Sequence, residues 1–154
     1  MTGGTVVVGL GNPILGDDAV GLRVARALAA ELAGEAGIDV RELHAGGIRV
    51  LDAIAGYERA VIVDAMRTGA LAPGSVRRLD LDDLGPARNL ASTHDTNLPT
   101  VLALGALLGL RMPREVAVYG VEALELEAFG EALSPEVERS VPEAARLIAR
   151  ELRP

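Results

Sequence analysis

Residues 5–21 of the chain read TVVVGLGNPILGDDAVG, and this stretch decides the fold. Its first part, Thr5–Leu10, is a compact β-branched run that is apolar on both faces and ends at Gly11, which predicts a buried strand in the centre of a parallel sheet. From Ala19 onward the apolar spacing becomes helical, at Val20, Val24, Leu28 and Leu32. The stretch therefore predicts a strand, a loop and a helix in succession.

Strands and helices continue to alternate along the rest of the chain. Further strands are predicted at Ile38–Leu43, Arg59–Val63 and Val116–Val121, and helices at Ile48–Ala55, at Leu98–Leu110 and from the N-cap and first-turn proline Ser134-Pro135 to Leu152. Val76–Leu81 alternates apolar and charged residues, which is typical of a sheet edge or a hairpin. The pattern predicts one α/β domain over residues 1–154, a three-layer α/β/α sandwich around a mostly parallel twisted sheet.

The composition excludes several kinds of chemistry. The chain has no cysteine, and all 15 of its basic residues are arginine, so thiolate sites, a phosphate-binding Walker lysine and a Schiff-base lysine are excluded. A net charge of −7 argues against a nucleic-acid partner. The apolar runs are too short to insert into a membrane, and the N-terminus lacks the basic segment of a secretory signal. We expect a cytoplasmic protein without a nucleotide or organic cofactor.

Three polar groups follow strands at the predicted carboxyl edge of the sheet, where open α/β sheets bind ligands. Asp17-Asp18 comes after the first strand, Asp64 directly after the third, and His94 lies in a later polar segment. Each has an ordinary structural explanation when taken alone: helix capping, loop organisation and surface exposure, respectively. Their convergence on one edge favours a shared site.

Two carboxylates and an imidazole suit a borderline divalent cation such as nickel or zinc, which can polarise a peptide carbonyl and acidify a water molecule. His44, near the end of the second strand, either touches this site or is structural. The dinucleotide motif G-x-G-x-x-G fails because Ile14 occupies the position of its third glycine. No serine lies in a G-x-S-x-G motif, so a serine nucleophile has little support.

Residues 8–21 closely resemble the opening of the hydrogenase maturation proteases. Similar segments follow over nearly the whole chain: residues 61–65 (VIVDA), 92–94 (STH), 118–122 (VYGVE) and 130–137 (GEALSPEV). The resemblance implies that Asp18, Asp64 and His94 are the metal-contacting and catalytic residues. The first of these is often Glu in the family, and Asp is shorter by one methylene, which changes its reach to a metal. Many relatives have an Asp-Gly-Gly-Thr-like turn where this chain has residues 44–47 (HAGG), so the sequence leaves open which hydrogenase is the client.

The function implied by the resemblance is that of an endopeptidase. It would remove the C-terminal extension of a nickel-iron hydrogenase large-subunit precursor after nickel insertion, with the nickel supplied by the precursor. Which carboxylate acts as base, and whether the metal is catalytic or a recognition signal, are left open by the sequence, as is the oligomeric state.

Two alternatives accompany this interpretation. Residues 8–13 also resemble the start of peptidyl-tRNA hydrolases, although the loop continues into Asp17-Asp18 and the chain is acidic. The same metal ligands would also serve a non-catalytic, metal-sensing maturation partner that docks on the hydrogenase subunit without cutting it.

Overall fold

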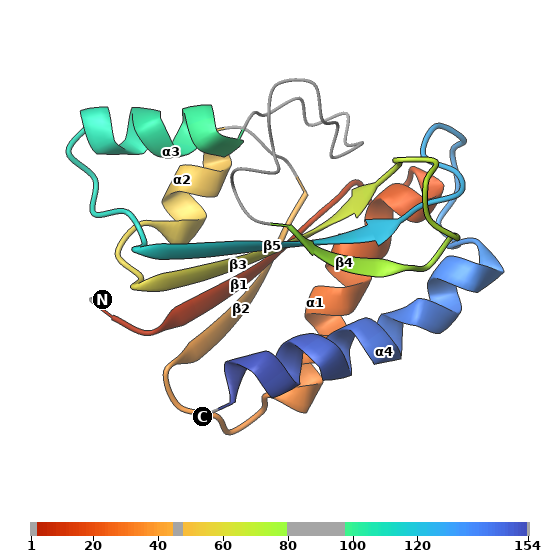
Figure 1. The fold of residues 1–154 in the computed structure, drawn as a ribbon, viewed down its shortest axis with the longest axis horizontal. Helices are drawn as coiled ribbons and strands as arrows, with labels where there is room; N and C mark the ends of the chain where they lie inside the picture. Colours follow the sequence, from red (N-terminus) through yellow and green to blue (C-terminus); the bar gives the residue numbers. More distant parts are fainter. Residues whose placement is uncertain (1–2, 45–47, 80–97, 154) are drawn as a thin grey trace.

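The computed structural model describes residues 3–44, 48–79 and 98–153, and Figure 1 shows their arrangement. Five strands form one sheet in the order β2-β1-β3-β5-β4. They are β1 (Thr5–Leu10), β2 (Ile38–Leu43), β3 (Arg59–Met66), β4 (Val76–Leu79) and β5 (Glu115–Glu122). All pairs are parallel except β4 with β5. The predicted mostly parallel sheet, with the short charged strand at its edge, is confirmed.

Helices cover both faces of this sheet. On one face lie α1 (Val20–Glu31) and α4 (Pro135–Leu152), and on the other α2 (Arg49–Ile54) and α3 (Leu98–Leu107), as Figure 1 shows. Because successive side chains of a strand point to opposite faces, each face has its own core. Val7 and Val63 belong to the core under α1 and α4, and Val8 and Ile62 to the core under α2 and α3. The predicted three-layer α/β/α arrangement is confirmed.

Glycines let α1 pack very close to β1 and β3. A Cβ atom at Gly9 would lie 2.2 Å from the carbonyl oxygen of Gly21. A Cβ atom at Gly21 would lie 2.3 Å from the carbonyl oxygen of Leu10 and 2.4 Å from that of Val63. Any side chain at these two positions would push the helix off the sheet. The glycine spacing of the opening stretch therefore sets the start of α1 against the ends of both strands.

In the described part of the chain, the ends of two elements lie three residues from their predicted positions. The third strand does not end at Val63 but continues to Met66, because β5 pairs with it as far as Glu122. α3 ends at Leu107 rather than at Leu110, since Gly109 adopts a left-handed backbone (φ +76°) that terminates the helix. The first of these differences matters for function, because it places Asp64 inside a paired strand rather than after one.

The predicted N-cap position and first-turn proline of the last helix are confirmed, but the Ser134 side chain does not cap the helix. α4 does begin at Pro135, and Ser134 occupies the N-cap position, but no side-chain hydrogen bond caps the helix. The Ser134 hydroxyl instead donates to the Asp17 carboxylate, at 2.8 Å. In the part of the chain that the structure describes, no helix combines the length and the apolar character needed to cross a membrane.

Candidate active site at the carboxyl edge of the sheet

Four buried carboxylates lie at or near the carboxyl ends of the parallel strands. Asp17 and Asp18 are fully buried in a short 3-10 helix, η1 (Gly16–Ala19), that joins β1 to α1. Asp64 in β3 and Glu122 at the end of β5 are each 2% exposed. A carboxylate removed from water is stable only if hydrogen-bond donors or a cation compensate it. The partners of each carboxylate therefore indicate what it does.

Asp17 is held by the connection between β5 and α4. Its carboxylate accepts hydrogen bonds from the backbone N–H groups of Leu124 and Glu125, both at 2.9 Å, and of Ser134, at 2.6 Å, in addition to the Ser134 hydroxyl. Its own N–H donates to the carbonyl of Glu125 at 2.9 Å. The carboxylate of Asp17 thus fastens η1 to a distant loop rather than capping the helix that follows it.

Asp18 is held by the loop that precedes it. Its Oδ2 atom accepts a hydrogen bond from the N–H of Asn12 at 3.1 Å. A Cβ atom at Gly11 would lie 2.3 Å from the Asp18 carbonyl oxygen, so only glycine allows the loop to approach so closely. The opening stretch therefore folds back on itself, which fixes Asp18 at the end of β1.

Asp64 lies on the strand next to β1. Its Oδ1 atom accepts a hydrogen bond from the N–H of Ala65 at 2.8 Å, and in the sheet it is paired with Gly120 of β5. By the alternation of the strand it shares a face with Ile62 and Met66, the face of α2 and α3. η1 contacts β3 directly, so the segments that carry Asp18 and Asp64 are neighbours.

The predicted nitrogen ligand, His94, lies outside the described residues, so its place at the site stays a prediction. His44 is described, and it is exposed immediately after the end of β2. Among residues 3–44, 48–79 and 98–153, no three Asp, Glu or His side chains are grouped so that they could hold a metal ion. The pair Asp18 and Asp64 nevertheless offers carboxylate oxygens, which suit a divalent cation.

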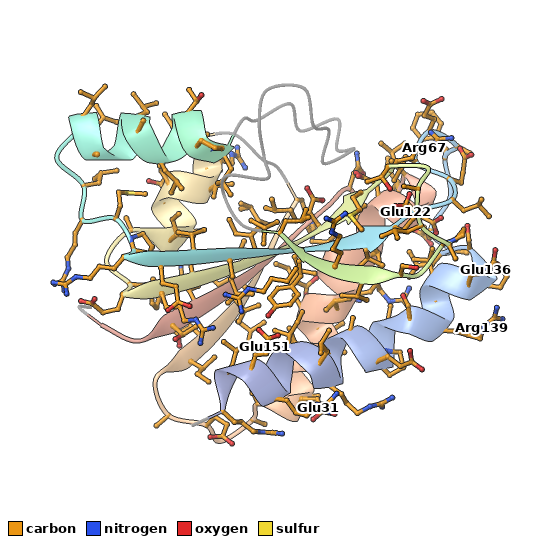
Figure 2. The ribbon with its side chains drawn as sticks, in the orientation of Figure 1. Glu31, Arg67, Glu122, Glu136, Arg139 and Glu151 are labelled. Atoms are coloured by element: carbon orange, nitrogen blue, oxygen red, sulfur yellow. The ribbon has the colours of Figure 1, made fainter. Side chains whose placement is uncertain are left out.

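Glu122 is a buried carboxylate that the sequence did not single out for a role. It accepts hydrogen bonds from the N–H of Thr68 at 2.9 Å, the Thr68 hydroxyl at 2.5 Å and the N–H of Gly69 at 3.3 Å. Figure 2 shows Glu122 at the same end of the sheet as Arg67. The sequence pattern at Glu122 is the same as at Asp64, an acidic residue after an apolar run. At Glu122 this pattern marks a residue whose carboxylate holds the turn after β3 in place.

Comparisons with known proteins connect this arrangement to one family. Residues 22–151 match the family model described as hydrogenase maturation protease. The hydrogenase expression/formation protein HupD of Thiocapsa roseopersicina is 30% identical over 146 residues, which cover 92% of this chain and 64% of that protein. The hydrogenase 2 maturation protease of Escherichia coli strain K12 is 29% identical over 150 residues, which cover 96% of this chain and 90% of that protein.

A solved structure shows the same architecture. The hydrogenase maturating endopeptidase HybD from Escherichia coli superposes with a TM-score of 0.77 at 28% identity, over 97% of this chain and 92% of that one. This chain thus spans less than two thirds of the length of the Thiocapsa protein but nearly all of the solved Escherichia coli structure.

Proposed function

The chain belongs to the hydrogenase maturation protease family, and we propose that it is an endopeptidase that removes the C-terminal extension of a nickel-iron hydrogenase large-subunit precursor after nickel insertion. One observation carries the proposal: Asp18 and Asp64 are buried carboxylates on contacting elements at the carboxyl edge of the sheet. Two negative groups in this position favour a cation between them. The nickel of the precursor would be that cation.

The roles of the residues follow from their chemistry. Asp18 and Asp64 would bind the nickel that the precursor carries, and His94 would supply a nitrogen ligand. One of the two carboxylates would accept the proton of the water molecule that attacks the peptide bond. The N–H groups of Asn12 and Ala65 hold the carboxylates in place before substrate arrives, which lowers the entropic cost of reaching the reactive geometry.

The proposal is tested by processing of the large-subunit precursor from the same organism, loaded with nickel or free of it, and followed by mass spectrometry. Wild-type protein should release a C-terminal peptide only from the nickel-loaded precursor. Asp18→Asn, Asp64→Asn and His94→Ala should each lower the rate by about 1,000-fold. Asp52→Asn is the matched control, because Asp52 is an exposed carboxylate on α2 and its removal should leave the rate unchanged.

Each other outcome has a definite meaning. Equal cleavage of nickel-free precursor would remove nickel from the proposal and leave an endopeptidase with a different trigger. Binding of the precursor without shortening would favour the non-catalytic, metal-sensing partner. Full activity of the Asp18→Asn and Asp64→Asn variants would show that the reaction does not depend on the two buried carboxylates.

A further inference from the structure

Seven of the nine large apolar side chains that are exposed on the described part of the molecule fall into two groups, and the other two are Ile48 and Leu71. One group lies at the C-terminal end of α3 and just beyond it, and consists of Leu104, Leu107, Leu108 and Leu110. The other consists of Ile14, Leu124 and Phe129, which are 48%, 49% and 83% exposed; we call it the Phe129 surface. Figure 1 shows the end of α3 and the loop between β5 and α4 at opposite ends of the molecule. The segments that carry the Phe129 surface are hydrogen-bonded to η1, the segment that also carries Asp18.

The two segments of the Phe129 surface are paired through their backbones. The N–H of Gly130 donates to the carbonyl of Ile14 at 2.8 Å, and the N–H of Gly16 donates to the carbonyl of Gly130 at 3.0 Å. The N–H of Leu124 donates to the Asp17 carboxylate. The backbones that carry Ile14, Leu124 and Phe129 are therefore fixed relative to η1, and so relative to Asp18.

The loop that carries Phe129 is also fixed internally. The Glu125 carboxylate accepts hydrogen bonds from the N–H groups of Glu127, at 3.1 Å, and Ala128, at 2.6 Å. Phe129 is the only phenylalanine of the chain. An aromatic side chain on a preordered loop loses little conformational freedom when a partner covers it, and such residues dominate many interfaces. A largely exposed Phe on a loop that is hydrogen-bonded to the segment carrying Asp18 is the arrangement expected of a docking point.

The charges around Phe129 indicate what the partner carries. Glu127 and Glu131 are exposed, two positions before and two positions after Phe129. Arg67 lies 3.8 Å from the carboxylate of Glu127 and offsets part of this negative charge. The chain as a whole has a net charge of −7. Charge complementarity therefore favours a partner whose apolar contact residues are flanked by basic ones.

We propose that the Phe129 surface binds an apolar segment of the precursor polypeptide that is flanked by basic residues, and so places the peptide bond to be cut at Asp18 and Asp64. The inference rests on the proposed function, because it assigns the substrate a second contact beside the site of cleavage. This contact would stabilise the bound precursor and the transition state to the same extent. Loss of the contact should therefore affect KM more than kcat.

The test compares Phe129→Ala, Phe129→Leu and Leu107→Ala with the wild type in processing of the nickel-loaded precursor. Phe129→Ala should raise KM about tenfold with little change in kcat, and Phe129→Leu should recover most of the loss because it restores an apolar side chain. Leu107, 85% exposed on α3, is the matched control, and its truncation should leave KM unchanged. Urea unfolding of each variant checks that the fold is intact.

A second arm tests the charges and separates the failure of this inference from that of the proposed function. Glu127→Gln with Glu131→Gln should raise KM at low salt and have less effect at high salt. If wild-type protein does not cut the precursor, the proposed function fails, while precursor affinity of wild type and Phe129→Ala, measured by biolayer interferometry, still tests the surface. Equal affinity or equal KM for these two proteins would overturn the inference. So would a homodimer, seen by sedimentation, that Phe129→Ala abolishes.

Discussion

Asp17 and Asp18 are adjacent, chemically identical and both fully buried, yet they serve different parts of the molecule. The hydrogen-bond donors to the Asp17 carboxylate lie 107 to 117 positions away along the chain, in the connection between β5 and α4. The carboxylate of Asp18 accepts a hydrogen bond from Asn12, six positions before it. Burial alone does not distinguish these two roles. A carboxylate whose donors lie far away along the chain links distant segments, whereas a carboxylate whose donor lies in the preceding loop is itself oriented by that loop.

Removal of the Asp17 carboxylate should have the largest effect on stability. Asp17→Ala leaves three backbone N–H groups, those of Leu124, Glu125 and Ser134, without their acceptor. Because lost hydrogen bonds to a charged group are costly, we expect the free energy of unfolding to fall by about 3 kcal/mol, measured by urea denaturation. Asp17→Asn should lose less, since the amide oxygen still accepts. A loss below about 1 kcal/mol for Asp17→Ala would contradict the role of Asp17 as a long-range fastener.

Glu122 extends the comparison to the other end of the sheet edge. It is the second buried carboxylate with several donors from a neighbouring loop, two backbone N–H groups and one hydroxyl. Glu122→Ala should therefore lower the free energy of unfolding by about 2 kcal/mol. The comparison variant is Thr68→Val, which keeps the N–H donor but removes the hydroxyl that donates to Glu122 and accepts from the N–H of Ala70, and it should lose about 1 kcal/mol. A loss for Glu122→Ala smaller than that for Thr68→Val would contradict the role of Glu122 in holding the turn after β3.

The sequence predicted the sheet well because its strands carry a local signal. Runs such as Thr5–Leu10 are apolar on both faces, which only the centre of a covered parallel sheet accommodates. The boundary of β3 was missed because it depends on pairing with β5, and pairing partners more than 50 residues away leave no mark on the run itself. The continuation of β3 to Met66 is therefore a property of the assembled sheet.

The contact between the elements that carry Asp18 and Asp64 was predictable for the same reason, whereas the roles of Asp18, Asp64 and His94 stay predictions. Asp18 and Asp64 stand out because each follows an apolar run, and the structure places their elements in contact. The role of Asp17 could not be predicted, since its donors are mainly backbone N–H groups, which every residue except proline has. Ser134 shows the same limit: its position before Pro135 predicts an N-cap, but its hydroxyl donates to Asp17 instead.

Replacement of Asp18 should cost much less stability than removal of the neighbouring Asp17 carboxylate. Asp18→Asn keeps the shape of the side chain and an oxygen that can accept from the N–H of Asn12, so the free energy of unfolding should change by about 1 kcal/mol or less. Urea denaturation beside Asp17→Ala measures the difference directly. If Asp18→Asn destabilised the protein as much as Asp17→Ala, the loss of processing expected for Asp18→Asn would reflect unfolding rather than chemistry.

Tyr119 lies on the opposite face of the sheet from Asp64, and its replacement should have a smaller effect on stability. The partner of its hydroxyl is a carboxylate rather than a set of N–H donors. Tyr119 of β5 is 1% exposed, and its hydroxyl donates to the Glu151 carboxylate of α4, a residue marked in Figure 2. Burial, followed by the hydrogen bond and the charge of Glu151, raises the pKa of Tyr119 above its usual value. The pKa of Tyr57 is also raised, mainly by its hydrogen bond to Asp39 and further by burial.

The sign of the pH effect follows from these directions. A folded-state pKa above the unfolded value of about 10 means that stability is complete below pH 10 and is lost as the pH rises further, because the unfolded chain gives up its proton first. Tyr119→Phe should be less stable than wild type by about 1 kcal/mol at pH 7, and the difference should shrink by about 1.4 kcal/mol per pH unit above pH 10. Absorbance at 295 nm reports the titration cleanly, since the chain has two tyrosines and no tryptophan. A native-state transition near pH 10 that disappears in Tyr119→Phe would show that the Tyr119 hydroxyl is not held by Glu151.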